Sequence, residues 1–246
     1  MEFDSDRDWK AWGKKDPLWA VATLPGKERG GRDPWTDEAF YRAGVGEWEA
    51  IRKVWTRYGR PAESVVELGC GAGRITNLLV NDFARVEACD ISEEMLAYAK
   101  QRLTQPAIRF HQSRGAEVPL DKGAVTAAFS TYVFQHFDSL EAGAAMFAEL
   151  SRVLAPGGTL FVQLPVHAFP FARTGLAALH GLRESAERLH AVVRRRLPLP
   201  PTMRGLSYPA DWFFRALPPL GLEGVELAWF ATGPETTVCA VLARKR

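Results

Sequence analysis

The chain has 246 residues, of which 47% are hydrophobic and 24% charged, and its formal net charge is +2 at pH 7. This length suits one domain with an elaborated lid, and the composition is that of an ordinary soluble globule. A near-neutral charge does not indicate a general nucleic-acid-binding surface. The three cysteines form no CxxC pair, so neither a disulfide framework nor a zinc set is expected. The acidic N-terminus is no secretory signal and no uncharged apolar run could cross a membrane, so we expect a cytoplasmic protein.

Residues 1–60 are rich in tryptophan, glycine and charge, and we expect them to form an N-terminal cap. A helix is predicted over about residues 37–58, because apolar residues recur there at helical spacing. Gly44 and Gly46 weaken this pattern, and a helix broken at these positions is the alternative to a continuous one. The cap is either a lid over a ligand or a cover for the outer helices of a sheet, and we expect both. It holds six of the eight tryptophans: Trp9, Trp12, Trp19, Trp35, Trp48 and Trp55.

Residues 61–164 are predicted to alternate strands with helices, which indicates right-handed crossovers and a mostly parallel sheet. The strands are expected at residues 64–68, 86–89, 108–110, 125–130 and 159–164, and the helices at 74–81, after the N-cap Ser92, and at 141–154.

Two further stretches complete the chain. Residues 165–207 are predicted to form a helical lid insertion, with an aromatic loop and an arginine-rich helix over about 174–196. Residues 208–246 are predicted to complete the sheet with a helix at 209–217 and strands at 225–230 and 237–243, of which the last is antiparallel because the return is short. The predicted fold class is therefore α/β, with a seven-stranded, mostly parallel sheet and helices on both faces.

A glycine-rich loop follows the first predicted strand. Gly69, Gly71 and Gly73 stand between Glu67 and Arg74. Glycines there permit a tight turn and the close approach of a ligand to the backbone. The G-x-G-x-G spacing, with Arg74 where a dinucleotide pattern has its last glycine, argues against a pyrophosphate ligand. Glu67 would repel a pyrophosphate but suits a cationic amino acid or a sulfonium.

Three motifs together resemble the class I S-adenosylmethionine (SAM)-dependent methyltransferases, in the UbiE-like small-molecule group. They are residues 67–76 (E-L-G-C-G-A-G-R-I-T), Asp90-Ile91-Ser92 followed by Met95, and residues 150–158 (L-S-R-V-L-A-P-G-G). The resemblance covers about residues 60–165, and 208–246 by pattern only. It implies a Rossmann-like fold and SAM as the cofactor, with S-adenosylhomocysteine as the product.

The resemblance also implies which residues hold the cofactor. Asp90 should bind the ribose and Ile91 should pack on the adenine. The alternative is that the glycines only form a strand–helix turn. The expected cofactor contacts are Glu67, Gly69, Cys70, Gly71, Arg74, Asp90, Ile91, Met95, Ser113, Arg114, Gly115, Ser130 and Thr131.

The sequence departs from the family pattern after the third strand. The family usually has an acid there that accepts from the adenine amino group, and Arg114 stands in its place. An arginine cannot accept that hydrogen bond. Ser113 or a backbone carbonyl would then have to accept the hydrogen bond from the adenine amino group. The alternative, which we expect, is that Arg114 points to solvent.

His136 is the predicted catalytic residue, because residues 129–136 resemble the family's fourth-strand segment and imidazole titrates near neutral pH. Methyl transfer has a good leaving group, so positioning alone can supply about 7–11 kcal/mol. His136 is therefore either a general base or a packing residue beside the cofactor. His111 is expected to be structural. The family's metal-dependent branch needs a cluster of acidic residues around the substrate. The sequence indicates no such cluster, so no metal is predicted.

The expected substrate contacts are mainly aromatic and come from both lids and from the segment after the fourth strand. The arginine-rich helix has two interpretations: a solvated helix face, or a surface for an anionic acceptor, an acidic partner or a membrane. The expected contacts are Trp35, Phe40, Tyr41, Tyr132, Gln135, His167, Phe169, Phe171, Met203 and Tyr208.

The sequence thus predicts a methyltransferase acting on an oxygen or nitrogen of a small, partly aromatic metabolite. A nicotinamide-dependent oxidoreductase is disfavoured by the glycine spacing and by the lack of a Tyr-x-x-x-Lys pair. An RNA methyltransferase and a non-catalytic SAM-fold binding protein remain alternatives. We expect a small-molecule acceptor, no nucleic acid, and a monomer or homodimer.

Overall fold

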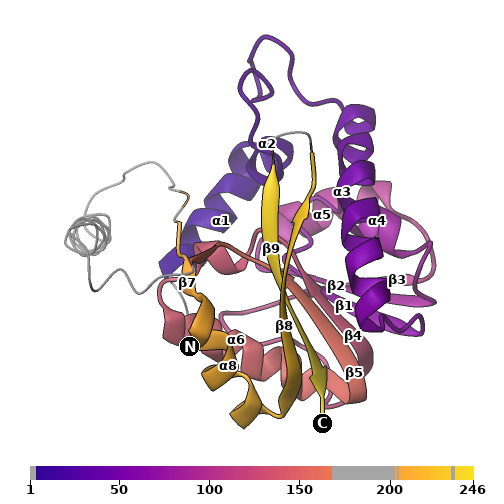
Figure 1. The fold of residues 1–246 in the computed structure, drawn as a ribbon. Helices are drawn as coiled ribbons and strands as arrows, with labels where there is room; N and C mark the ends of the chain where they lie inside the picture. Colours follow the sequence, from indigo (N-terminus) through magenta and orange to yellow (C-terminus); the bar gives the residue numbers. More distant parts are fainter. Residues whose placement is uncertain (1–3, 168–202, 204, 234–235) are drawn as a thin grey trace, which may run out of the picture.

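A computed structural model of the chain describes residues 4–167, 203, 205–233 and 236–246 (Figure 1). Its centre is a seven-stranded sheet in the order β3-β2-β1-β4-β5-β9-β8. The first five strands in this order are mutually parallel, and β9 runs antiparallel to both of its neighbours. The strands are β1 (Ser64–Leu68), β2 (Arg85–Asp90), β3 (Ile108–Gln112), β4 (Val125–Ser130), β5 (Leu154–Gln163), β8 (Leu222–Ala231) and β9 (Thr237–Lys245). The predicted fold class is confirmed.

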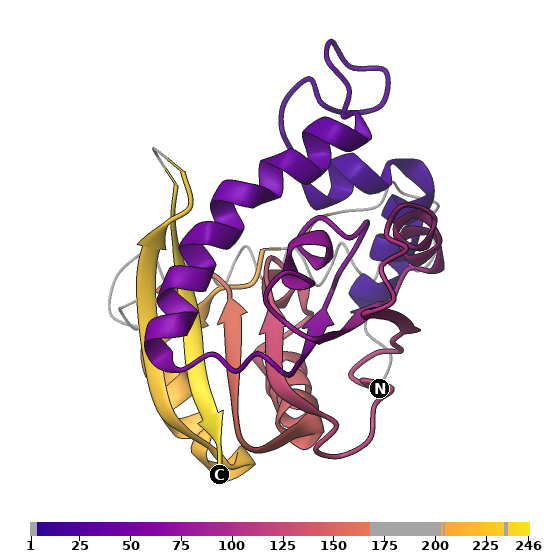
Figure 2. The same ribbon diagram turned by 90° about the vertical axis from the view of Figure 1, so that its right-hand side faces the viewer.

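Helices cover both faces of this sheet. On one face lie α3 (Asp37–Tyr58), α4 (Thr76–Leu79) and α5 (Glu93–Arg102), and on the other lie α6 (Leu140–Val153) and α8 (Ala210–Ala216). Figure 2 shows α3 running diagonally across the sheet. Alternate residues of one strand point to opposite faces, so Val65 packs beneath α3 while its neighbour Val66 packs toward α6.

Helix α3 is continuous through its glycines, so the alternative of a broken helix does not apply. Thr36 caps its start by accepting from the Ala39 amide, and Gly59 ends it with a left-handed φ of 109°. Gly44 lies at a point of close approach: a Cβ there would come within 3.2 Å of Arg74 Cγ. The glycine therefore serves packing, and burial of the helix outweighs its low helix propensity.

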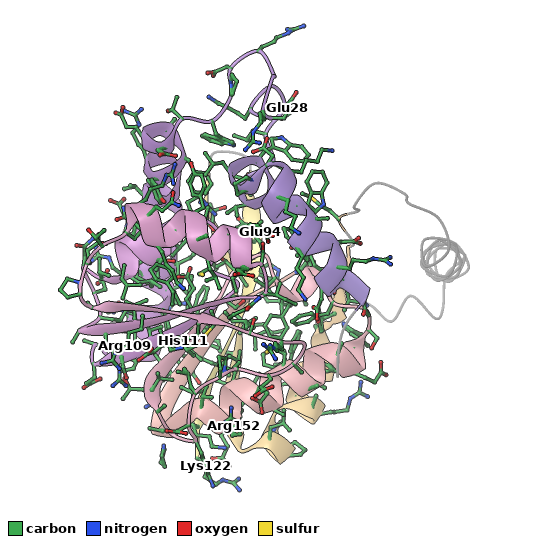
Figure 3. All side chains as sticks on the ribbon, turned by 180° about the vertical axis from the view of Figure 1, so that it is seen from behind. Glu28, Glu94, Arg109, His111, Lys122 and Arg152 are labelled. Atoms are coloured by element: carbon green, nitrogen blue, oxygen red, sulfur yellow. The ribbon has the colours of Figure 1, made fainter. Side chains whose placement is uncertain are left out.

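Two N-terminal helices were not predicted. α1 (Asp4–Lys15) and α2 (Pro17–Val21) follow one another and pack against α5. Lys14 of α1 lies 3.3 Å from Glu94, which is labelled beside this helix in Figure 3. Both helices are short, and α1 is rich in charge, so they depend on this packing rather than on intrinsic propensity.

Two of the tryptophans belong to the core rather than to a ligand wall. Trp55 is fully buried, stacks on Phe129 with ring centroids 5.8 Å apart, and donates from Nε1 to Thr159 Oγ1 over 3.0 Å. Trp48 packs edge-on against the same phenylalanine. These two rings cover the sheet itself, whereas the sequence prediction had the N-terminal aromatics covering the sheet's outer helices.

Beyond the main sheet, β6 (Val166–His167) pairs in parallel with β7 (Tyr208–Pro209). The described ranges also contain the 3-10 helices η1 (Phe134–His136) and η3 (Pro218–Leu220). The predicted lid helix at 174–196 lies outside the described residues. Among the helices that are described, none combines the length and the apolarity needed to cross a membrane.

Candidate active site

A cavity of about 400 Å³ opens at the carboxyl ends of β1, β2 and β4. In open α/β sheets this edge is where ligands bind. Its described wall includes the glycine loop after β1, the segment after β2, residues 113 and 115, and residues 131–137 after β4. Residues of the N-terminal helices and of α3, α5 and α6, together with residue 203, also line it.

The glycine loop has a backbone that only glycine adopts readily. Gly69, Gly71 and Gly73 have φ values of 75°, 54° and 85°. A Cβ on Gly69 would overlap Val133, and one on Gly71 would lie 2.6 Å from Val21 Cγ2. The loop is therefore held between the segment after β4 and helix α2, with its backbone exposed to the cavity. Its left-handed turns also delay the next helix, and α4 is shorter than the predicted 74–81.

Asp90 ends β2 beside this loop. Its Oδ2 accepts from the Gly71 amide over 2.8 Å, and its Oδ1 accepts from the Ser92 amide over 2.8 Å. Burial raises the pKa of the Asp90 carboxyl, and the backbone hydrogen bonds oppose that shift. Asp90, the residue predicted to bind the ribose, thus lines the cavity and also holds the glycine loop to β2.

Glu67 lies at the base of the cavity and is almost fully buried. Burial raises its pKa from 4.5 to about 7, although the Thr76 hydroxyl donates to its Oε2 over 2.5 Å. The neighbouring Cys70 thiol is also buried, which raises its pKa well above the usual value. Near neutral pH the Glu67 carboxyl is therefore poised between its two protonation states, and Cys70 is protonated.

Arg74 forms a buried ion pair with Glu47 of α3. Arg74 Nη1 donates to Glu47 Oε2 over 2.6 Å, and each side chain is no more than 10% exposed. Both residues line the cavity. The sequence prediction missed Glu47, although a signal was present: it stands in the buried stripe of helix 37–58, where an acid needs a partner.

Tyr132 has the one left-handed backbone among the described non-glycine residues, with a φ of 58°. Its amide donates to Gln163 Oε1 over 2.8 Å. Its hydroxyl hydrogen-bonds to Glu47 and Thr232, and burial raises its pKa to about 12. Such strain persists where the surrounding structure enforces it, and it is commonest at functional sites.

His136 ends η1 at another part of the wall. Its ring packs against Trp9 with centroids 4.7 Å apart, and its Nε2 lies 3.2 Å from Gln135 Nε2. Residues from α1, α6 and residue 203 join this region of the cavity: Ser5, Asp6, Met146 and Met203. The arrangement combines apolar and aromatic walls with a few polar groups, as small-molecule sites do.

The structure brings most of the expected site residues to this one cavity. From the expected cofactor contacts the wall includes Glu67, Gly69, Cys70, Gly71, Arg74, Asp90, Ile91, Met95, Ser113, Gly115 and Thr131. From the expected catalytic and substrate residues it includes Trp35, Tyr132, Gln135, His136 and Met203.

Two expected cofactor residues lie elsewhere. Ser130 is fully buried and donates to the Leu68 carbonyl over 3.0 Å, so it links β4 to β1. Arg114 is exposed and forms a turn in which its carbonyl accepts from the Glu117 amide. The expectation that Arg114 points away from the ligand agrees with this exposure, and Ser113 is the residue that reaches the cavity.

Four expected substrate residues also lie outside the cavity wall. Phe40 is fully buried beneath the glycine loop, and Tyr41 donates to the Ala72 carbonyl over 3.0 Å. Tyr208 is fully buried and donates to the Phe134 carbonyl over 3.0 Å. His167 pairs with Ser207 over 2.9 Å. Phe40 and Tyr41 thus pack against the glycine loop and Tyr208 against η1. Phe169 and Phe171 lie outside the described residues.

His111 has the structural position expected of it. It lies on the edge strand β3 beside Arg109 (Figure 3), and its Nε2 is 2.6 Å from Glu87 Oε2. Residues missed by the sequence prediction come mainly from the unpredicted helices α1 and α2 and from α3: Ser5, Asp6, Trp9, Ala20, Val21 and Glu47.

Comparison with known proteins identifies the core. A family model described as a methyltransferase domain matches residues 66–162. The trans-aconitate 2-methyltransferase of Acidovorax sp. (strain JS42) is 38% identical over 116 residues, which are 46% of this chain and 43% of that protein. The match therefore spans less than half the length of this curated relative.

Two solved structures share the fold. A chain of the complex between the Haloferax volcanii Trm112 methyltransferase activator and a methyltransferase has a TM-score of 0.61 at 16% identity, covering 94% of this chain and 99% of that one. The magnesium protoporphyrin IX methyltransferase of Synechocystis PCC 6803, with bound S-adenosylhomocysteine, has a TM-score of 0.56 at 16% identity, covering 85% and 84%. The family match shows that residues 66–162 of this chain form a methyltransferase domain. The glycine loop and the strand order are those expected of a class I SAM-dependent member of that family.

Proposed function

We propose that this chain transfers a methyl group from SAM to an oxygen or nitrogen atom of a small, partly aromatic acceptor. The observation that carries the proposal is a single cavity whose wall joins the glycine loop and Asp90 to the Trp9–His136 pair. Bound SAM would supply a methyl group on a sulfonium sulfur, which is already a good leaving group. The protein then needs to orient two reactants and exclude water, and this can contribute about 7–11 kcal/mol.

The residues at the glycine loop suit this cofactor. Gly69 and Gly71 leave backbone exposed where a side chain would fill the space, and Asp90 presents a carboxylate to a ribose hydroxyl. Arg74 has a buried Nε without a hydrogen-bond acceptor among the described residues. Arg74 also lines the cavity, where its positive charge suits a ligand carboxylate. Ile91 and Ser113 line the part of the wall that would meet an adenine.

The acceptor would occupy the part of the cavity beside Trp9, Gln135 and His136. Apolar side chains there, with the two methionines Met146 and Met203, suit an acceptor with an aromatic or aliphatic body. His136 is the candidate to take a proton from a hydroxyl or amine acceptor. The named substrates of two similar proteins, trans-aconitate and magnesium protoporphyrin IX, are small molecules, which supports a small acceptor.

Calorimetric titration of the purified chain with S-adenosylhomocysteine tests the proposal, with NADH as the matched control. We expect micromolar affinity for the first and none for the second. Release of S-adenosylhomocysteine from SAM across an acceptor panel then identifies the acceptor. A chain that binds NADH, or that leaves S-adenosylhomocysteine unbound, would overturn the proposed activity.

A further inference from the structure

The ion pair between Glu47 and Arg74 is unusual in its position. Glu47 belongs to α3, outside the matched domain at 66–162, yet it lines the same cavity as the glycine loop. Glu47 is 8% exposed and Arg74 is 7% exposed. Burying two charges costs several kcal/mol per ion, so such a pair weakly supports stability and more often serves a specific role.

The hydrogen bonds of this pair are incomplete. Arg74 has five N–H donors in a planar fork, of which Nη1 serves Glu47 and Nε has no partner among the described residues. The guanidinium therefore keeps N–H donors that Glu47 does not use, and guanidinium donors suit a carboxylate. Glu47 accepts from Arg74 and interacts with the Tyr132 hydroxyl. Its two oxygens offer about four acceptor positions, so capacity for a cationic donor remains.

Three features hold Glu47 in this position. Gly44, one turn earlier on α3, lets the helix approach Arg74 closely. Tyr132 reaches Glu47 from a strained left-handed backbone, which Gln163 holds by accepting from the Tyr132 amide. The strain and the glycine each cost stability, and both serve to set the charges of Glu47 and Arg74 beside the cavity.

We propose that Glu47 is a specificity-determining residue that binds the α-ammonium group of the methionine end of the cofactor, while Arg74 binds the α-carboxylate. The inference rests on the proposed function. An α-amino acid carries one positive and one negative group, both attached to its α-carbon. The Glu47–Arg74 pair presents one negative and one positive side chain to the cavity. The other wall carboxyls, Asp6, Glu67 and Asp90, do not take part in this pair. Each charge of the ligand therefore meets the opposite charge of the pair, and a ligand that lacks one of its charges loses that interaction.

The test compares two ligands that differ only in this ammonium group: S-adenosylhomocysteine and its desamino analogue, in which hydrogen replaces the α-amino group. We expect the wild-type chain to bind S-adenosylhomocysteine about tenfold or more tightly than the analogue, as for a charge-assisted hydrogen bond. Glu47→Gln keeps the size of the side chain and an acceptor oxygen. It should lose about tenfold in affinity for S-adenosylhomocysteine and little for the analogue, so that the preference largely disappears. Glu49→Gln, exposed on the same helix, should retain the full preference.

Each other outcome has a definite meaning. A wild-type chain that binds both ligands equally overturns the assignment without any variant. Glu47→Gln that keeps the wild-type preference, or that weakens both ligands equally, overturns it too, because Glu47 would then only shape the wall. A wild-type chain that binds neither ligand contradicts the proposed function itself, which separates the two failures.

Discussion

The backbone amide of Gly71 donates a hydrogen bond over 2.8 Å to Asp90 Oδ2, so the acid at the end of β2 fixes the glycine loop that follows β1. The same carboxylate accepts from the Ser92 amide. One side chain therefore couples the geometry of two loops that border the cavity. Because the carboxyl ends of parallel neighbours meet at one edge, only the paired register of β1 and β2 produces this contact.

Asp90→Ala should weaken binding of S-adenosylhomocysteine by about tenfold or more and lower the free energy of unfolding by about 1–3 kcal/mol, because two buried amides lose their acceptor. Calorimetry and urea unfolding measure the two effects. Asp121→Ala, at an exposed position, is the control and should change neither. Unchanged affinity in Asp90→Ala would contradict the placement of the cofactor.

Gly44→Ala and Gly46→Ala form a matched pair on α3. A methyl group on Gly46 meets nothing within 4 Å, so this variant should gain about 1 kcal/mol from helix propensity. A methyl group on Gly44 lies 3.2 Å from Arg74 Cγ and from the Arg74 carbonyl oxygen, so crowding offsets that gain. We expect a higher melting temperature for Gly46→Ala only. Equal stabilisation of both variants would mean that α3 is free to move away from Arg74.

Stability should fall as the pH rises through the titration of Glu67. Its pKa is raised from 4.5 in the unfolded chain to about 7 in the folded chain. Below pH 4.5 the Glu67 carboxyl is protonated in both the folded and the unfolded chain. Between the two pKa values it is protonated only in the folded chain, so each rise in pH favours unfolding. Above about pH 7 this loss is complete, at about 3 kcal/mol.

Urea unfolding at about pH 5 and about pH 8 measures this dependence. Glu67→Gln should reduce the difference between the two conditions, whereas Glu49→Gln, exposed on α3, should leave it unchanged. Asp90 also has a raised pKa and adds a change of the same sign, so some dependence should persist in the variant. A Glu67→Gln variant with the full wild-type dependence would show that this carboxyl is not the titrating group.

Trp55→Ala should destabilise the fold by about 3–5 kcal/mol, because it leaves a cavity between α3 and the sheet. The ring is fully buried and its Nε1 donates to Thr159. Trp229→Ala is the matched control, since that ring on the edge strand β8 is 55% exposed. Chemical denaturation of both variants compares them, and similar losses would argue against the core position of Trp55.

His136→Ala should lower turnover far more than it lowers affinity for S-adenosylhomocysteine. A general base typically contributes about a hundredfold to ten-thousandfold to the rate. Once the acceptor panel has identified a substrate, the measurement is kcat for that substrate together with the calorimetric Kd for S-adenosylhomocysteine. Trp9→Phe is the control, because it keeps an aromatic ring beside position 136. A parallel fall in both quantities would make His136 a wall residue and not a base.

Most helices and strands of the core could be predicted to within a few residues because their signals are local. β5 is an exception: it begins at Leu154 and runs through the segment that was predicted to be a turn before residue 159. Periodicity gave β1, β4 and α3 with their observed bounds, and Ser92 marked the start of α5. The helices at the N-terminus could not be predicted in the same way. α1 and α2 are short and partly polar, and they exist through their contacts with α5, which no local pattern contains.

The motifs around Gly69, Asp90 and residues 150–158 were sufficient to predict the family, because glycine turns and strand-end acids are specified by short stretches of chain. The partners of those motifs depended on the tertiary structure. The ion pair of Glu47 with Arg74 spans 27 positions, and the Tyr132–Gln163 hydrogen bond spans 31. Such contacts arise only when α3 is laid across the sheet and β4 is set beside β5. The kind of chemistry could therefore be predicted from the sequence, whereas the residues that enclose the ligand are set by packing between distant segments.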